Sequence, residues 1–352
     1  MAQELLIYGA YGYTGKLIVE EAVKQGLRPM LSGRNHSKLG QLASKYDLNH
    51  IAFELSDEQA LNNVLKQVKL VIHCAGPFAF TAIPMAKACI AQGVHYLDIT
   101  GEYSVFEDLH ALDKEAKAAG VMLLPGAGFD VVPSDCLANR LKHLLPGADS
   151  ITLAFTSERA SVSRGTAKTM VENAGEGHLM RKGGKLVRLP LGKVVRSIDY
   201  GPFEQLSVGI SWGDISTAYY STGIPNVLVL TGTDEKQLKS LKVAQRLRLL
   251  LRSKWVKNMI KRRIDKKPEG PSEERRSKAA MYLWGKATRG TQEVQQRLKT
   301  PNGYTLTAKT VVLIASKILK GEYRDGYQTP ATAYGKDLIL EVPGCEWGEG
   351  VE

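Results

Sequence analysis

The sequence has no long apolar run and few cysteines, and these absences exclude several classes of protein. No window of about 18 uninterrupted apolar residues occurs, so no segment is predicted to span a membrane. The first apolar run, Leu5 to Tyr8, is too short for the core of a secretory signal peptide. The four cysteines lie far apart and form neither a CxxC pair nor a zinc spacing. We therefore expect reduced thiols, no metal site and a cytoplasmic location.

The net positive charge is concentrated in one segment, and the rest of the chain has about as many acids as bases. The whole chain has a formal net charge of +11, whereas residues 236–267 contain 13 Lys or Arg and one acid, Asp265. The rest of the chain is therefore close to neutral, which argues against nucleic-acid binding by the whole surface. The segment itself has three interpretations: a pair of helices on an anionic membrane, a mobile cover or dimer contact on a second domain, and, least favoured, a nucleic-acid patch.

The first third of the chain alternates between short apolar runs and segments of helical periodicity. Apolar runs are predicted as six strands at 5–8, 29–31, 50–53, 70–72, 94–99 and 121–124. Helices are predicted between them at 13–25, 36–46, 57–67, 81–92 and 105–119. Such alternation is typical of βαβ units around a buried parallel sheet, so we predict an α/β, Rossmann-type, doubly wound domain.

The remainder has a different pattern. Runs rich in Thr, Ser, Val and Tyr at 148–157 and between 186 and 230 favour a largely antiparallel sheet with few helices. We therefore predict two domains: a nucleotide-binding domain at 1–130, and a mixed α+β substrate and oligomerisation domain at 131–352 that carries the basic excursion at 236–267. The stretch 266–277 is the strongest linker candidate, because it combines Pro, Gly and many charges.

A glycine-rich turn joins the first predicted strand to the first predicted helix. Glycines at such a turn let the backbone approach a pyrophosphate at the helix N-terminus, where N–H groups and the helix dipole favour an anion. A P-loop is excluded, because Ala10 replaces its first glycine and Leu17 its metal-binding hydroxyl. The predicted contacts are Gly9, Tyr11, Gly12, Tyr13, Thr14 and Gly15.

The end of the second predicted strand indicates NADP in preference to NAD. Where an NAD site has an acid for the ribose, this chain has Ser32, Gly33, Arg34 and Asn35, with Lys38 nearby. Arg34 is suited to clamp a 2′-phosphate. Small residues and a turn also follow the fourth strand, where the backbone should skirt the nicotinamide half of the cofactor. These residues are Ala75, Gly76, Pro77 and Phe78.

Candidate catalytic groups lie where the later strands of this domain are predicted to end. Asp98 and Glu102 are two carboxylates four residues apart, a spacing that lets neighbouring environments separate their pKa values. Tyr103 is a candidate proton donor, and Asp130 lies in a Gly-rich loop after the sixth strand. Each has a structural alternative: the acids as anchors of their loops, the tyrosine as a packing residue. In the second domain, Arg164 and Lys168 are candidates to hold an anionic substrate tail.

Several blocks together resemble the saccharopine dehydrogenase-like oxidoreductases, and most closely the branch that includes trans-acting enoyl reductases. Besides the turns above, they are residues 95–102, 126–135, 165–167, 221–226 and 269–274. The resemblance implies an NADP-binding Rossmann domain, a mixed α+β domain and a small-molecule substrate between them. The bond reduced is left open: C=C or C=O in a lipid-like or polyketide-like substrate, C–N chemistry on an amino acid such as saccharopine, or a non-enzymatic NADP-binding module.

A GxSxG motif at 209–213 points to a hydrolase, but the rest of the chain does not support it. That nucleophile elbow needs a following helix and a later histidine. The last histidine of the chain, His178, precedes Ser211. Residues 214–220 lack a clear helical pattern.

Overall fold

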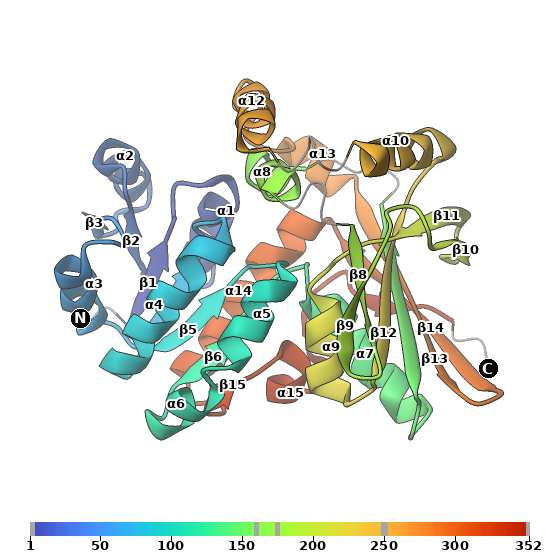
Figure 1. The fold of residues 1–352 in the computed structure, drawn as a ribbon. Helices are drawn as coiled ribbons and strands as arrows, with labels where there is room; N and C mark the ends of the chain where they lie inside the picture. Colours follow the sequence, from blue (N-terminus) through green and yellow to red (C-terminus); the bar gives the residue numbers. More distant parts are fainter. Residues whose placement is uncertain (1–3, 158–161, 173–176, 248–252, 350–352) are drawn as a thin grey trace. The chain divides into compact units, whose positions relative to one another are not determined.

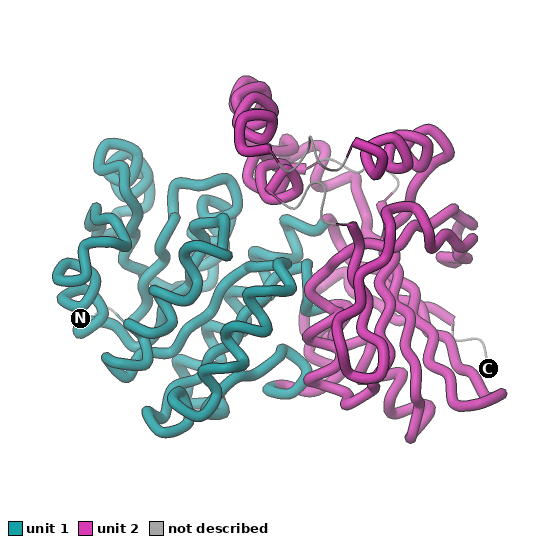
Figure 2. The backbone as a smooth tube through the Cα atoms, in the orientation of Figure 1, with its two compact units in different colours: residues 1–132, 303–333 teal, residues 133–302, 334–352 magenta. Residues whose placement is uncertain are grey.

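The computed structural model describes residues 4–157, 162–172, 177–247 and 253–349. These residues form two compact units (Figure 2). Unit 1 comprises residues 1–132 and 303–333, and unit 2 comprises residues 133–302 and 334–352. The sequence predicted a single boundary near 130, whereas the chain returns to unit 1 at 303–333. No helix among the described residues is both long and apolar enough to cross a membrane.

Unit 1 is built on a seven-stranded parallel sheet in the order β15-β6-β5-β4-β1-β2-β3. The first six strands fall where the apolar runs predicted them. They are short, and all but β3, whose residues are half-buried, are almost fully buried. Their order confirms the predicted Rossmann-type fold. The strands are β1 (Leu5–Tyr8), β2 (Met30–Gly33), β3 (His50–Ala52), β4 (Leu70–His73), β5 (His95–Asp98), β6 (Met122–Leu124) and β15 (Gly326–Tyr327).

Helices cover this sheet, and two of them differ from the prediction (Figure 1). The segment predicted as one helix at 105–119 forms two, α5 and α6, and the helix predicted at 81–92 already begins at Phe78. Asn35 and Asp57 cap the helices that follow them through their side-chain oxygens. The helices are α1 (Tyr13–Lys24), α2 (His36–Tyr46), α3 (Glu58–Leu65), α4 (Phe78–Gln92), α5 (Tyr103–His110), α6 (Asp113–Ala118) and α14 (Gly303–Leu319).

The late helix α14 belongs to the core of unit 1. It packs against α1 and against strands β4 and β5. Most of its residues are buried, and the Thr310 hydroxyl donates to the Ala127 carbonyl oxygen over 2.8 Å. Strand β15, which follows α14, then pairs with β6 at the edge of the sheet.

Unit 2 contains a mixed, largely antiparallel sheet, as the sequence predicted. Its main path runs β10-β11-β12-β7-β13-β14-β16, and only β12 and β7 pair in parallel. Strands β8 and β9 form a hairpin that joins the sheet at β12. The strands are β7 (Ser150–Thr156), β8 (His178–Lys182), β9 (Lys185–Leu189), β10 (Val195–Asp199), β11 (Glu204–Gly209), β12 (Asn226–Gly232), β13 (Ala280–Arg289), β14 (Gln292–Pro301) and β16 (Glu346–Trp347).

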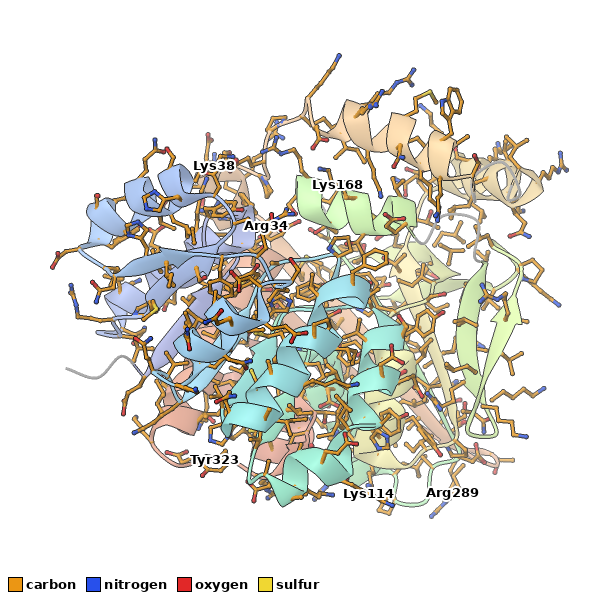
Figure 3. The ribbon with its side chains drawn as sticks, turned by 60° about the vertical axis from the view of Figure 1, so that its left-hand side comes forward. Arg34, Lys38, Lys114, Lys168, Arg289 and Tyr323 are labelled. Carbon is orange, nitrogen blue, oxygen red and sulfur yellow. The ribbon has the colours of Figure 1, made fainter. Side chains whose placement is uncertain are left out.

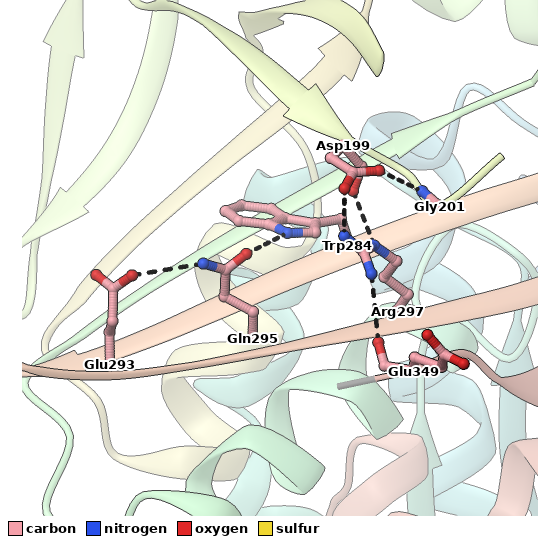
Figure 4. Close-up of polar contacts among 7 residues, drawn as sticks. All are labelled: Asp199, Gly201, Trp284, Glu293, Gln295, Arg297 and Glu349. Atoms are coloured by element: carbon pink, nitrogen blue, oxygen red, sulfur yellow. Dashed lines mark hydrogen bonds and ion pairs between the residues drawn. The ribbon is translucent and has the colours of Figure 1, made fainter. Parts of the chain in front are cut away.

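The sheet of unit 2 has an apolar core with polar links at its edge. Trp284 and Tyr200 lie in the core cluster, and the Trp284 indole donates to Gln295 over 3.0 Å (Figure 4). Arg297 pairs with Asp199 at 2.6 Å, which ties β14 to the end of β10.

More helices accompany this sheet than the sequence predicted. Residues 214–222 form a helix, which corrects the expectation that 214–220 is not helical. Its formation is aided by a left-handed C-cap at Gly223 and by burial of most of its residues. The helices are α7 (Val132–Leu144), α8 (Arg164–Glu172), α9 (Asp214–Thr222), α10 (Glu235–Arg246), α12 (Lys254–Ile264), α13 (Glu273–Ser277) and the short η1 (Leu338–Glu341). The short helix α15 (Pro330–Tyr334) lies where the chain passes from unit 1 to unit 2.

Candidate dinucleotide site

The glycine turn between β1 and α1 is held tightly by its neighbours. Gly9 has φ +86°, a conformation that disfavours L side chains, and its N–H donates to the Ser32 carbonyl oxygen over 2.8 Å. A Cβ at Gly9 would lie 2.9 Å from the Ala75 nitrogen, and a Cβ at Gly15 would overlap the Gly9 carbonyl oxygen. The turn is therefore packed against both the β2 and β4 ends, and two of its glycines are required by sterics.

The start of α1 fits a bound pyrophosphate. Gly12 is the N-cap residue, no side chain caps this helix end, and no acid lies in its first turn. An N-terminus without a side-chain acceptor presents N–H donors and a positive dipole end to an anion. Because residue 12 is glycine, no side chain hinders a phosphate that approaches the backbone here. An added Cβ would have one close neighbour, the Gly9 carbonyl oxygen at 3.2 Å.

The loop after β2 separates structural residues from exposed cations. The Ser32 hydroxyl donates to the Ile51 carbonyl oxygen over 3.0 Å, and Asn35 accepts from the Lys38 N–H over 2.9 Å, so both hold the loop. Arg34 and Lys38 are exposed, and Figure 3 marks both side chains. Lys38 Nζ lies 5.9 Å from the centroid of the Tyr11 ring.

Tyr11 connects the glycine turn to this loop. A Cβ at Gly33 would lie 2.7 Å from Tyr11 Cε1, so the ring packs directly on the Gly33 backbone. The structure therefore gathers Tyr11, Gly33, Arg34 and Lys38 around one exposed surface. Lys38, which the sequence placed near Arg34, lies on the first turn of α2, the helix that the Asn35 side chain caps.

The loop after β4 lies beside the glycine turn, because a Cβ at Gly9 would be only 2.9 Å from the Ala75 nitrogen. The Thr81 hydroxyl donates to the Ala75 carbonyl oxygen over 2.8 Å, which fixes the loop to the first turn of α4. His73, at the end of β4, is fully buried, and its Nε2 lies 2.9 Å from Thr81 Oγ1. Burial lowers the pKa of His73 to about 3, so this ring is neutral and belongs to the core.

Asp98 anchors two loops. Its Oδ1 accepts from the Thr100 N–H over 3.0 Å and from the Gly126 N–H over 2.8 Å, and its Oδ2 accepts from the Tyr96 hydroxyl over 2.7 Å. Burial raises the pKa of Asp98 to about 6 against the opposing effect of these hydrogen bonds. The arrangement matches the structural alternative considered for this residue.

Glu102 occupies the N-terminus of α4. Its carboxylate accepts from the Phe78 N–H over 2.9 Å and from the Ala79 N–H over 3.3 Å. An anion in that position is favoured by the helix dipole. Tyr103 follows as the first residue of α5.

Asp130 lies against the loop that contains Glu102. A Cβ at Gly101 would be 2.7 Å from Asp130 Oδ2, so the carboxyl group is in close contact with the backbone after β5. Burial of this carboxyl raises the pKa of Asp130 to about 7. The pKa of Asp130 is thus closer to neutral pH than that of Asp98. The structure thus brings Asp98, Glu102 and Asp130 to the loops after β5 and β6.

The remaining candidates have structural partners. Arg164 pairs with Glu269 at 3.0 Å and Lys168 with Asp265 at 2.5 Å, so these cations of unit 2 are bound to acids. Ser211 follows a strand and precedes helix α9, but its hydroxyl accepts from the Leu179 N–H over 2.9 Å. No cluster of His, Cys, Asp and Glu among the described residues could hold a metal ion.

Comparisons with known proteins agree with this geometry. Residues 5–124 match the family model described as saccharopine dehydrogenase NADP binding domain. The chain is 29% identical over 203 residues to a mouse saccharopine dehydrogenase-like oxidoreductase, which covers 51% of this chain and 47% of that protein. It is 28% identical over 187 residues to a Caenorhabditis elegans protein named lipid droplet localized protein, covering 48% and 44%. A Mycobacterium tuberculosis protein named as a trans-acting enoyl reductase is 28% identical over 184 residues, covering 48% and 43%.

The chain spans about half the length of the curated relatives it matches. Over its full length it has the fold of the L-Glu-forming saccharopine dehydrogenase of Saccharomyces cerevisiae, with a TM-score of 0.68, 13% identity and coverage of 99% of this chain and 100% of that one. Residues 5–124 therefore match the model of the saccharopine dehydrogenase NADP-binding domain, which confirms the resemblance predicted from the sequence and supports the predicted NADP cofactor.

Proposed function

We propose that the protein is an NADP-dependent oxidoreductase that transfers a hydride to a C=C or C=O bond of a lipid-like or polyketide-like substrate. The observation that carries the proposal is a carboxyl group, Asp130, with a pKa of about 7, on the loops at the same end of the sheet as the glycine turn. Ligands of doubly wound sheets bind at this end of the strands.

Different residues of the chain would bind different parts of the cofactor. The turn from Gly9 to Gly15 would hold the pyrophosphate on the N-terminus of α1, and Arg34 and Lys38 would hold the 2′-phosphate. The Tyr11 ring, packed on Gly33, gives that region a flat apolar wall. The bound cofactor supplies the hydride, and the protein supplies orientation and a proton.

The proposed proton donor is Asp130. The hydride adds to one atom of the double bond, and the other atom takes a proton from the Asp130 carboxyl, which regains one from solvent. A carboxyl with a pKa near 7 holds its proton in a large fraction of molecules at neutral pH. Glu102 and Asp98 are positioning residues, because they fix the loops around Asp130, and Tyr103 stays a second candidate donor.

The apolar character of the substrate has separate support. Phe80, in the first turn of α4, has 70% of its surface exposed close to the Ala75–Phe78 loop. Phe80 is proposed as a contact for an apolar substrate because of its place beside this loop, since the exposure of one ring needs no explanation by itself. Two relatives carry names that mention an enoyl reductase and a lipid droplet.

The test is NADPH oxidation with a panel of enoyl thioesters and long-chain ketones, together with NADP reduction in the presence of saccharopine. We expect turnover with an enoyl or carbonyl compound, falling as pH rises above about 7, where Asp130 loses its proton. Asp130→Asn should bind NADPH normally but lose most turnover. Oxidation of saccharopine with NADP would favour C–N chemistry instead, and NADPH binding without turnover of any substrate would favour a non-enzymatic module.

We further infer a cytoplasmic homodimer that meets its apolar substrate at a membrane surface. The dimer is tested by light scattering after size-exclusion chromatography, where a monomer mass would contradict it. Neither the dimer nor the location affects the assignment of Asp130.

A further inference from the structure

Helix α12 has one face that combines cations with two exposed apolar side chains. The residues of this face recur at helical spacing and are all exposed: Lys254, Trp255, Asn258, Met259, Arg262 and Arg263. Trp255 has 72% of its surface exposed and Met259 has 38%. No acid occurs anywhere in the helix. These six residues are called the α12 face below.

The opposite side of α12 is fixed to unit 2. The helix packs against α8, and Ile264 is buried. Lys257 and Lys261 both approach the Glu172 carboxylate, the former at 3.9 Å. Two cations of the helix are thus paired with an acid on the inner side. Among the described residues no ion pair involves Lys254, Arg262 or Arg263.

A tryptophan exposed in this way is costly in water unless a partner covers it. A single exposed apolar residue needs no explanation, but here an indole, a thioether and three cations share one helix face. Helix α10 adds a similar pattern, with exposed Val243 in the helix and exposed Leu247 at its C-cap, close to Lys and Arg residues. Trp side chains beside Lys and Arg are typical of helices that lie in the interface of an anionic membrane.

We propose that the α12 face binds the surface of an anionic phospholipid bilayer. The cations would contact lipid phosphates, and Trp255 and Met259 would enter the headgroup region. Charge complementarity favours this partner, because the segment 236–267 holds the whole positive excess of a chain that is otherwise near neutral. Residues 248–252, between the two basic helices, lie outside the described residues, and the sequence interpretation that includes them stays a prediction. The proposal goes beyond the proposed reaction and does not rest on it.

The experiment measures binding of the full chain to vesicles. Vesicles of phosphatidylcholine and phosphatidylglycerol in equal parts are compared with vesicles of phosphatidylcholine alone, at low and high salt. We expect sedimentation with the anionic vesicles only, and loss of that binding at high salt. Trp255 fluorescence should shift to the blue on binding and be quenched by brominated lipid. The Trp255→Phe variant should bind but lose most of the shift.

Two sets of variants assign the binding to the α12 face. Replacing Lys254, Arg262 and Arg263 by Glu should weaken binding by at least about tenfold. The matched control replaces three exposed cations of unit 1, Lys114, Lys320 and Arg324, by Glu, and should retain most of the binding although its net charge is the same. Trp255→Ala with Met259→Ala should weaken binding by about tenfold, whereas Leu340→Ala, at another exposed apolar residue, should not.

Three outcomes would overturn the proposal. One is equal binding to neutral and anionic vesicles. Another is equal loss in the α12 and control charge variants, which would mean that net charge alone attracts the protein. The third is tighter binding to a DNA or RNA duplex at the same salt, insensitive to Trp255→Ala, which would identify a nucleic-acid surface. NADP affinity is measured on every variant and should be unchanged, which separates failure of this face from failure of the fold or of the cofactor site.

Discussion

At the scale of single residues, we propose that the choice between NADP and NAD depends on the exposed cation Arg34. No acidic side chain occupies the position where NAD sites bind the ribose hydroxyls, so we expect Arg34→Ala to weaken NADP more than NAD. A lost charge-assisted contact costs about 1.5–3 kcal/mol, or roughly 10- to 150-fold in affinity. Titration calorimetry with both cofactors measures this. Arg34→Lys should lose less, because a point charge remains. Equal losses for NADP and NAD would contradict the role assigned to Arg34.

Asp98 makes the stability of unit 1 depend on pH. Its pKa is about 6 in the folded protein, because of burial, and about 3.9 in an unfolded chain. The folded state therefore binds more protons between these values, and stability falls as pH rises from about 4 to about 6. The expected loss attributable to Asp98 is roughly 3 kcal/mol.

Two substitutions isolate this effect. Asp98→Asn keeps an oxygen for the Thr100 and Gly126 N–H groups but no longer titrates. The free energy of unfolding of Asp98→Asn, relative to that of the natural chain, should therefore be higher at pH 7 than at pH 4. Both are measured by unfolding in urea. Asp98→Ala leaves buried donors without an acceptor and should be less stable by at least about 2 kcal/mol at both pH values. Parallel pH curves for the Asn variant and the natural chain would contradict the raised pKa.

At the scale of elements, two glycines of the β1–α1 turn have different roles: Gly12 leaves room for a phosphate, and Gly15 allows close packing. Gly12 has an ordinary φ of −66°, and an added Cβ would meet only the Gly9 carbonyl oxygen, at 3.2 Å. Gly15 is buried, and its Cβ would overlap backbone atoms of Gly9 and Ala10. Gly12→Val should therefore fold and fail to bind NADP, whereas Gly15→Val should be strongly destabilised. Calorimetric titration and thermal unfolding distinguish the two. Near-normal NADP affinity in Gly12→Val would mean that the phosphate does not approach this turn.

Short apolar strands could be predicted from the sequence, whereas helix limits and late elements could not. Strands β1 and β4 are continuous apolar runs, so burial on both faces is visible in the residues themselves. The break between α5 and α6 near Ala111 has no Gly or Pro to mark it. Helix α9 is rich in Ser, Thr and Tyr, which have weak helix propensity, and burial in unit 2 outweighs that preference.

The candidate site was predictable where backbone geometry restricts residue type. Glycines at Gly9 and Gly33 are needed for positive φ or close packing, so their pattern is visible in the sequence. Carboxylates carry no such signal. Asp98 as an anchor and Asp130 with a raised pKa differ only in their surroundings, which form when the loops after β5 and β6 meet.

At the scale of the whole molecule, a single domain boundary does not describe how the chain divides, because each unit is made of two separate stretches. Unit 1 recruits residues 303–333, because α14 is apolar over most of its length and packs on α1 and the sheet. An apolar helix pattern indicates that a segment is buried but does not say against which core. The chain therefore passes between the two units more than once. Residues far outside the stretch 5–124, which the family model matches, complete unit 1.

This organisation predicts how the cofactor stabilises the chain. A ligand that binds only the folded state at 100 times its Kd adds about 2.7 kcal/mol. In a unit of about 150–250 residues each kcal/mol raises the unfolding temperature by about 2–4 °C, so saturating NADP should raise that of unit 1 by roughly 5–10 °C. Because α14 belongs to unit 1, its amides should gain protection from hydrogen exchange together with those of β1 and β4, although residues 303–319 lie far from the turn in sequence. Gly12→Val should show neither change. Protection confined to residues 5–124, with α14 exchanging as in the free protein, would mean that α14 is not part of the cooperative unit that the cofactor stabilises.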